Sequence, residues 1–322
     1  MTRANASRRP RDPDPPAAAG YAAVLARLSA ASVTRRFDAY ADIDWDAPDF
    51  RIDPTDRRWQ LPADDPLGQT DWYRTRPVEL RARLGLHLAA EFMKVGVQFE
   101  SALMRGLLEF AADLPSGAPE FRYAYHEVAE EAQHGLMFQE FIRRSGLPVR
   151  GLSRPHRAAA RRVARLGRTF PELFFVFVLA GEDPIDHVQR AILRADQPRH
   201  PLLCRIMRIH VTEEARHLCF AREFLRQRVP RLAAPRRLRL ALSAPCILAT
   251  ASGPMLRPSA DVVRRYAIPR AVMQRAYTRN PQHRDAVRDA IAGVRDLLDE
   301  LGLITPVAAG LWRLLGLDPR AA

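Results

Sequence analysis

The sequence predicts an all-α protein built around a ferritin-like four-helix bundle with additional flanking helices. Apolar residues recur at helical spacing over long stretches, whereas runs of alternating β-branched residues are scarce. Short Pro- and Gly-containing segments separate these stretches. The chain has 322 residues, of which 47% are hydrophobic, and this is enough for a sizeable core. We therefore expect a single domain over residues 21–322.

The N-terminal part of the chain is expected to lie outside the bundle. Residues 1–20 carry paired arginines but no apolar stretch typical of a signal peptide, so they predict a disordered basic tail and a cytoplasmic protein. A short helix is predicted from Ala22 to Leu28. An arm rich in Trp, Asp and Pro follows and extends to residue 75.

Four long helices come next and form the predicted bundle over about residues 78–230. The first is expected over residues 78–113 and the second over residues 120–145. The third covers residues 171–195 and begins with a proline, which suits a first helical turn. The fourth runs from residue 201 to the proline at 230.

The remaining segment, residues 236–322, is predicted to add further helices to the same domain, because no linker precedes it. Within it, residues 240–256 are uncharged over a length that approaches a membrane span. The stretch is interrupted by Pro245 and Pro254, and we interpret it as a buried helix.

Charge and cysteine content restrict the function classes. The formal net charge is +13, carried almost entirely by arginine, and arginines concentrate in residues 150–168 and 226–239 without any acidic residue. Neither a recognition fold nor interleaved aromatic residues accompany them, so we expect a solvated face or a docking patch rather than specific nucleic-acid binding. Three widely spaced cysteines without a CxxC pair argue against disulfides and a thiolate zinc site.

A repeated five-residue phrase carries the candidate chemistry. It reads EEAQH at residues 130–134 in the second predicted helix and EEARH at residues 213–217 in the fourth, 83 residues later. Residues three apart share a helix face, so each phrase contains a Glu-x-x-His pair able to bind a metal ion. The two pairs are Glu131 with His134 and Glu214 with His217.

The same spacing adds one histidine and leaves two more glutamates open as ligands. His210 lies one turn before the second pair, on the same helix face, and is a further candidate ligand. Glu130 and Glu213 each stand four residues before a histidine, so spacing alone does not exclude them as ligands.

Dimetal four-helix bundles of the ferritin-like type need one more carboxylate from each of the other two helices. Glu100 precedes Glu131 by 31 residues, and Glu182 precedes Glu214 by 32 residues. Glu100 lies on the apolar stripe of its helix, which should face the core. Its competitor Glu91 is nine residues away, on the opposite side of the helix, where we expect a solvated face.

Glu182 follows the most apolar run of the chain, where an unpaired carboxylate would be costly. Gly181 and Pro184 flank it and are expected to distort the helix, which makes Asp183 and Asp186 possible substitutes as ligands. Asp186 is also a candidate, together with the neighbouring His187, to support the ligands by hydrogen bonding.

The donor set indicates which metal would bind. Four carboxylates balance the charge of two divalent ions, and neutral histidines complete the coordination. Such a set suits iron or manganese better than zinc. The candidate ligands are Glu100, Glu131, His134, Glu182, His210, Glu214 and His217.

At these residues the chain resembles the p-aminobenzoate N-oxygenase (AurF-like) family of non-haem diiron oxygenases. The order of the ligands and the phrases EEAQHGLMF and HVTEEARHLCFARE are similar to that family, from about residue 75 to the C-terminal LWRLLGL. The resemblance implies that all seven residues are ligands, and that the additional histidine, His210, separates the site from those of desaturases and ferritins. It also implies two iron ions as cofactors and O2 as co-substrate.

The resemblance further implies a monooxygenase that oxygenates a small aromatic amine at nitrogen. Electrons would come from an external ferredoxin- or flavin-type reductase, because the chain has no dinucleotide-binding glycine fingerprint and no iron–sulfur cysteine set. Three competing hypotheses are a hydroxylase or desaturase acting at carbon, a ferritin-like storage protein without an organic substrate, and a basic helical protein that binds nucleic acid. Manganese in place of one iron and a homodimer are compatible with the sequence.

Overall fold

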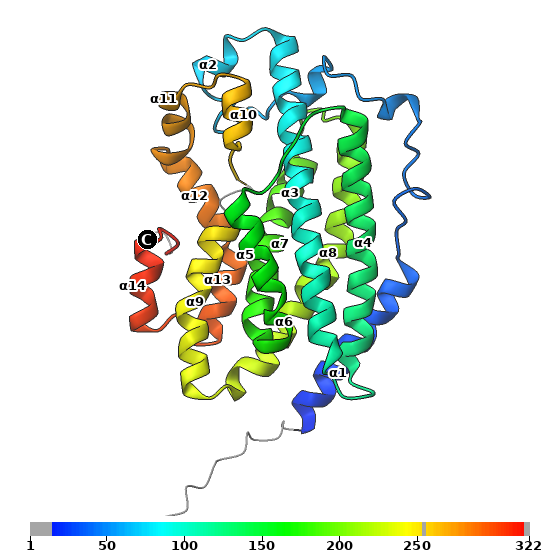
Figure 1. Ribbon diagram of the computed structural model, residues 1–322, viewed down its shortest axis with the longest axis vertical. Coiled ribbons are helices and arrows are strands. Elements are labelled where there is room, and N and C mark those ends of the chain that lie inside the picture. The colour runs from blue at the N-terminus through cyan, green and yellow to red at the C-terminus, as the bar shows by residue number, and fades with distance from the viewer. Residues whose placement is uncertain (1–14, 253–255, 319–322) are drawn as a thin grey trace, which may run out of the picture.

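In the computed structural model, which describes residues 15–252 and 256–318, every regular element is helical and no β-strand is present. The four predicted long helices form the bundle at the centre of the molecule (Figure 1). Their observed bounds lie within two residues of those predicted. They are α3 (Val78–Ala112), α4 (Pro119–Ser145), α7 (Pro171–Arg194) and α8 (Pro201–Arg228).

Local sequence signals explain where these helices begin and end. Pro119, Pro171 and Pro201 each occupy the first turn, where the missing N–H of proline costs no hydrogen bond. Helix α4 ends at Gly146, whose φ of 63° lies in the left-handed region that glycine adopts without strain.

Close approach between α3 and α7 depends on Gly181. A Cβ atom at this position would lie 1.9 Å from Cζ of Phe99, so no larger residue fits there. Helix α7 nevertheless continues through Gly181 and Pro184 to Arg194. The expected distortion therefore does not end the helix, and Glu182 remains fully buried.

Flanking helices cover the bundle on several sides. Helix α1 (Pro15–Thr34) packs on α4 and α8 and extends the predicted helix at both ends. Residues 15–20 of the expected disordered tail are therefore helical, and residues 1–14 lie outside the described residues. Helices α5 (Arg154–Ala164) and α6 (Leu166–Thr169) pack on α3 where the sequence indicated only a connecting basic segment. Helix α9 (Ala234–Ser252) packs on α7.

The remaining elements are short. In the arm before α3 they are the 3₁₀ turns Pro48–Phe50 and Arg57–Trp59 and helix α2 (Asp71–Arg74). The 3₁₀ turn Val229–Arg231 lies between α8 and α9. After α9 they are α10 (Ala260–Arg265), α11 (Arg270–Met273), the π turn Gln274–Thr278, α12 (Pro281–Ala290), α13 (Ala292–Glu300) and α14 (Pro306–Leu314).

Helix α9 contains most of the uncharged stretch that resembled a membrane span. Leu240, Ala244 and Leu248 are buried against the core, which agrees with the predicted buried helix. Pro254 of that stretch lies outside the described residues. None of the helices in the described part of the chain combines the length and the apolar character needed to cross a membrane.

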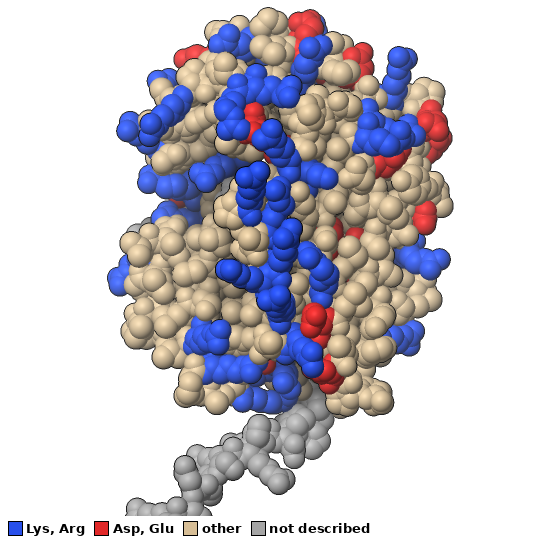
Figure 2. Space-filling model, in the orientation of Figure 1, with Lys and Arg blue, Asp and Glu red and all other residues tan. Residues whose placement is uncertain are grey.

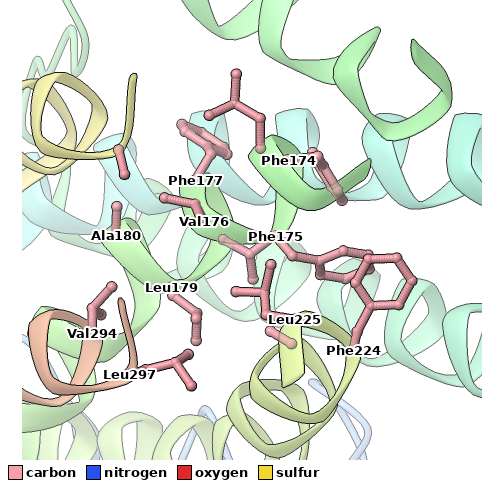
Figure 3. Packing of buried hydrophobic residues seen from close by; sticks show 14 of the residues in the cluster. Phe174, Phe175, Val176, Phe177, Leu179, Ala180, Phe224, Leu225, Val294 and Leu297 are labelled. Atoms are coloured by element: carbon pink, nitrogen blue, oxygen red, sulfur yellow. The ribbon is translucent and has the colours of Figure 1, made fainter. Parts of the chain in front are cut away.

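Two apolar clusters fill the bundle, and a polar layer separates them. The larger is rich in phenylalanine and extends to α9 and α13; Figure 3 shows part of it, where the rings of Phe175 and Phe224 lie 4.4 Å apart. On α4, Ala124 belongs to this cluster and Met137 to the other. Both Glu-x-x-His pairs lie between the clusters, so apolar side chains shield the site from both sides.

The two arginine-rich stretches differ in their surroundings. Figure 2 shows a stripe of basic side chains along the middle of one face, where Figure 1 places α5. Six of the seven arginines in residues 150–168 are exposed. Those of residues 226–239 are partly tied into the fold, since Arg226 pairs with Glu300 at 2.9 Å and Arg236 with Glu172 at 3.1 Å. Docking of an acidic partner on the α5 stripe stays a prediction.

Candidate metal centre

The polar layer brings all seven predicted ligands together at the centre of the bundle. Each side chain belongs to a residue that is at most 2% exposed, and all four bundle helices contribute. Glu100 comes from α3 and Glu182 from α7, while α4 and α8 provide the Glu-x-x-His pairs.

Two glutamates lie between the histidines of the repeated phrase. Carboxylate oxygens of Glu131 lie 3.1 Å from Nδ1 of His134 and 3.1 Å from Nδ1 of His217. Glu214 Oε1 lies 3.4 Å and 3.1 Å from the same two nitrogens. Each carboxylate therefore faces both histidines, as bridging ligands of a dimetal centre do.

His210 completes the arrangement from α8. Its Nε2 lies 3.7 Å from Glu100 Oε1 and 4.0 Å from Glu182 Oε2. These separations are too long for hydrogen bonds. They suit atoms that share a cation, since a metal ion at roughly 2 Å from each ligand atom holds those atoms about 3–4 Å apart.

Four groups of three residues in the described part of the chain place their ligand atoms within 4.8 Å of one another. Together they contain every predicted ligand and one residue that the sequence analysis did not single out, Glu127. The groups are Glu100–His134–His210, Glu131–His134–Glu214, Glu182–His210–Glu214 and Glu127–Glu131–His217.

The electrostatics of the site favour bound cations. Both carboxylate oxygens of Glu182 and one of Glu100 are buried without a hydrogen-bond partner, which is costly for an unpaired charge. Burial and the neighbouring carboxylates raise the pKa of both groups well above the usual range. Burial lowers the pKa of His134, but hydrogen bonds to Glu131 and Glu213 outweigh it and raise the pKa to about 10. The residues therefore fit metal ions, which neutralise the same charge as protons do.

Glu130 and Glu213 hold the far side of the two imidazole rings. Glu213 Oε2 lies 2.9 Å from Nε2 of His134, and Glu130 Oε2 lies 2.7 Å from Nε2 of His217. The contacts cross between the helices, since each glutamate supports the histidine of the other phrase. With Nε2–H donating to a carboxylate, Nδ1 is free for a metal ion. This geometry favours Glu131 and Glu214 over Glu130 and Glu213 as ligands.

Arg216 joins these two supporting carboxylates and was not singled out from the sequence. Its Nη2 donates to Glu130 Oε1 at 2.8 Å and lies 3.5 Å from Glu213 Oε1. The matching position in the first phrase is Gln133, whose Oε1 accepts a hydrogen bond from the Ala39 amide at 2.8 Å. Arg216 thus secures helix α8 through contacts with two carboxylates, and Gln133 secures helix α4 through a hydrogen bond with the N-terminal arm.

Arg216 and the additional carboxylates also change the charge count. Seven buried glutamates and one arginine leave six negative charges rather than four, if the histidines are neutral. Two divalent ions leave two of these charges unbalanced, whereas two trivalent ions balance all six. The glutamates are Glu100, Glu127, Glu130, Glu131, Glu182, Glu213 and Glu214.

Asp183 and Asp186 on α7 pair with arginines instead of facing the metal centre. Asp183 bonds to Arg222, and Asp186 bonds to Arg190 at 2.7 Å, so neither replaces Glu182 as a candidate ligand.

The expectation that Glu91 is solvated is wrong. Residue 91 is only 6% exposed, because the segment after α4 covers it. Its Oε1 accepts a hydrogen bond from the Gly151 amide at 3.2 Å.

A cavity of about 500 Å³ lies within one to two helical turns of candidate ligands on α7 and α8, although none of the seven candidate ligands lines it. Its lining includes Met207, one turn before His210 on α8, and Gln189, two turns after Glu182 on α7. Both amide atoms of Gln189 and Nε of Arg199 are buried there without a hydrogen-bond partner. His187 lines this cavity as well, where the sequence had suggested a contact with the ligands.

Comparison with known proteins finds one family whose sequence model matches most of the chain. The sequence model of a family described as "P-aminobenzoate N-oxygenase AurF" matches residues 18–302, a range that contains all four bundle helices. Uncharacterised proteins of Mycobacterium tuberculosis (strains CDC 1551 and H37Rv) and Mycobacterium bovis are 41% identical to the chain over 300 residues. The alignments cover 93% of this chain and 88% of each relative.

Proposed function

Since the chain belongs to the p-aminobenzoate N-oxygenase AurF family, we propose that it is a non-haem diiron oxygenase that uses O2 to oxygenate a small aromatic amine at nitrogen. The observation that carries this proposal is the crossed geometry of the repeated phrase. Two glutamates face both Nδ1 atoms while two further glutamates support both Nε2 atoms. Such a donor set, rich in carboxylates and without sulfur, suits iron.

The seven candidate ligands would hold the two iron ions, and Glu131 and Glu214 among them face the histidines of both phrases. The irons, when bound, supply the activation of O2 and the transfer of oxygen. Glu130 and Glu213 keep a proton on Nε2 of each histidine and so fix the ring orientation. Phe138 lies 5.4 Å from the ring of His210 and helps to exclude water from that side of the centre.

The cavity of about 500 Å³ would hold a small organic substrate near the centre. Most of the residues that line it are apolar, as is usual for a small-molecule site, and several polar and charged side chains lie among them. Met207 would direct a ring toward the centre, and the unpartnered groups of Gln189 and Arg199 would hold a polar substituent. This cavity favours an enzyme over a storage protein, which needs no organic substrate beside its metal ions.

Two further elements of the proposal concern electrons and the site of attack. An external reductase of the ferredoxin or flavin type would deliver electrons, and the exposed arginine stripe on α5 would suit a reductase with an acidic surface. Oxidation at carbon is the second candidate reaction, because the same metal centre and cavity would serve a hydroxylase.

Single-turnover chemistry tests the proposal. Purified protein is loaded with ferrous iron, exposed to O2 with a panel of arylamines, and the products are identified by mass spectrometry. We expect hydroxylamine, nitroso or nitro products from at least one amine. Ring or side-chain hydroxylation would instead identify a carbon oxygenase. Accumulation of many ferric ions per chain with every amine unchanged would identify a storage protein.

A further inference from the structure

The internal repeat extends one helical turn beyond the phrase that first revealed it. Glu127 stands 83 residues before His210, the same offset that relates Glu131 to Glu214 and His134 to His217. Helices α4 and α8 therefore present matching sets at spacings i, i+4 and i+7, with a glutamate in one set where the other has a histidine. Residues at these spacings share one face of a helix, and in α8 that face carries metal-ligand candidates at all three positions.

Glu127 has no structural partner that would explain its burial. It is fully buried, and neither carboxylate oxygen makes a hydrogen bond. Among the buried carboxylates in the described ranges, only Glu182 shares this property. Buried glutamates away from the polar layer have partners: Glu140 bonds to Arg143 and Glu172 to Arg236, and Glu91 accepts a backbone hydrogen bond.

The position of Glu127 points it at one side of the metal centre. A carboxylate oxygen lies within 4.8 Å of ligand atoms of both Glu131 and His217. His210, its counterpart, belongs to one close group with His134 and Glu100 and to another with Glu214 and Glu182. The two residues thus occupy equivalent places near the two different histidines of the repeated phrase.

Three states are open to a carboxylate in such a place: ionised and unpaired, protonated, or bound to a cation. Burial of an unpaired charge is the most costly. A protonated acid would donate its own hydrogen to an acceptor, and Glu127 makes no such hydrogen bond. A metal ion held by Glu131 and His217 would satisfy the carboxylate directly.

We propose that Glu127 is an eighth protein ligand, which binds the metal ion that Glu131 and His217 hold. The inference rests on the dimetal centre of the proposed function. It gives one metal an additional anionic ligand where the other receives the neutral imidazole of His210. The two ions would therefore have ligand sets of different chemical type, since a glutamate takes in one set the position that a histidine takes in the other.

Anaerobic iron binding to the purified full-length chain tests this assignment. Ferrous iron is titrated against a chromophoric chelator, and ⁵⁷Fe Mössbauer spectra of the loaded protein are recorded. The variant is Glu127→Gln, which keeps the shape but removes the anionic ligand. The control is Glu120→Gln, two turns earlier on the same helix and partly exposed.

In wild type and in the control we expect two irons per chain. In Glu127→Gln we expect one of the two irons to lose at least about tenfold in affinity, with only its quadrupole doublet changed. If Glu127→Gln fails to fold, Glu127→His places at this position the residue that the chain itself uses at position 210. That variant should bind two irons and show one shifted doublet.

The outcomes separate this inference from the proposed function. Two irons in wild type with unchanged affinity and spectra in Glu127→Gln, or an unshifted spectrum in Glu127→His, would overturn the eighth ligand and leave the dimetal centre intact. Fewer than two irons in wild type would overturn the dimetal centre itself.

Discussion

The crossed hydrogen bonds behind the two imidazole rings should govern how tightly each iron is held. Replacing Glu213 by Gln keeps the size of the side chain and its contact with His134 Nε2. In the wild type this nitrogen lies 2.9 Å from Glu213 Oε2. The replacement removes the negative charge that strengthens the hydrogen bond and raises the basicity of Nδ1 on the opposite side of the ring. The variant therefore weakens a metal ligand without deleting it.

The expected magnitude follows from comparable supporting contacts. Changing the hydrogen-bond partner of a metal-bound histidine typically costs 10–100-fold in metal affinity, which corresponds to about 1.4–2.7 kcal/mol. Because Glu213 supports His134 and Glu130 supports His217, each single variant should weaken mainly one iron. Chelator competition with ferrous iron measures the two affinities, and Mössbauer spectra show which iron has changed.

The double variant tests whether the two supports act independently. Arg216 contacts the carboxylates of both Glu130 and Glu213. When one of them is replaced, the guanidinium should therefore interact more strongly with the carboxylate that remains. We expect the combined loss for Glu130→Gln with Glu213→Gln to differ from the sum of the single losses. Glu223→Gln, on α8 and outside the polar layer, is the matched control. Unchanged iron affinity in both single variants would refute this account of how the histidines are oriented.

Three further predictions concern the same centre and its cavity. His210→Leu leaves the other candidate ligands, so it should still take up iron but lose most amine oxygenation, whereas Glu131→Ala should lose iron. Metal analysis and product assays compare the two variants. Unchanged turnover in His210→Leu would show that this histidine is not a ligand. With a pKa of about 10, His134 carries a proton at pH 7 that a metal ion must displace, so iron affinity should rise with pH and iron binding should release protons. Calorimetry in buffers of different ionisation enthalpy measures the protons released. Iron binding without proton release would contradict this prediction. Gln189→Leu removes unpartnered amide atoms from the cavity wall. It should raise the KM for a polar-substituted arylamine several-fold with little change in iron content. An unchanged KM would exclude a contact between Gln189 and the polar substituent.

The bundle helices were predictable because several local signals agree in each of them. Apolar stripes at helical spacing coincide with prolines in the first turns and with Gly146 at the end of α4. Helix α5 lacked such agreement. Its sequence, RPHRAAARRVA, offers only alanines and one valine as an apolar face, and packing on α3 supplies what the pattern did not indicate.

The burial of Glu91 escaped prediction for a related reason. Helical spacing places Glu91 on the face opposite to Glu100, and a helix with only one buried face would expose it to solvent. A long central helix can instead be covered on both sides. The segment at Gly151, 60 residues later in the chain, closes over Glu91, and nothing in the local sequence of α3 records that contact.

The choice between neighbouring glutamates shows where spacing stops being informative. In each phrase both glutamates reach the helix face of the histidine, one at i+3 and one at i+4. What separates them is which imidazole nitrogen each faces, and for Glu130 and Glu213 that nitrogen belongs to the other helix. Only the packing of α4 against α8 determines this relation, so no property of either phrase alone could have given it.

Glu127, in contrast, could have been predicted from the sequence. It lies one helical turn before the first EEAxH phrase, so a search limited to that phrase does not reach it. His210 was found as a residue one turn before the second Glu-x-x-His pair. The same step applied to the first pair leads to Glu127, a side chain of another type but with equal capacity to bind a hard cation. In a duplicated metal site, a ligand position should therefore be searched in both halves by chemical class rather than by residue identity. A difference between the halves, here glutamate against histidine, then becomes a prediction about how the two metal ions differ.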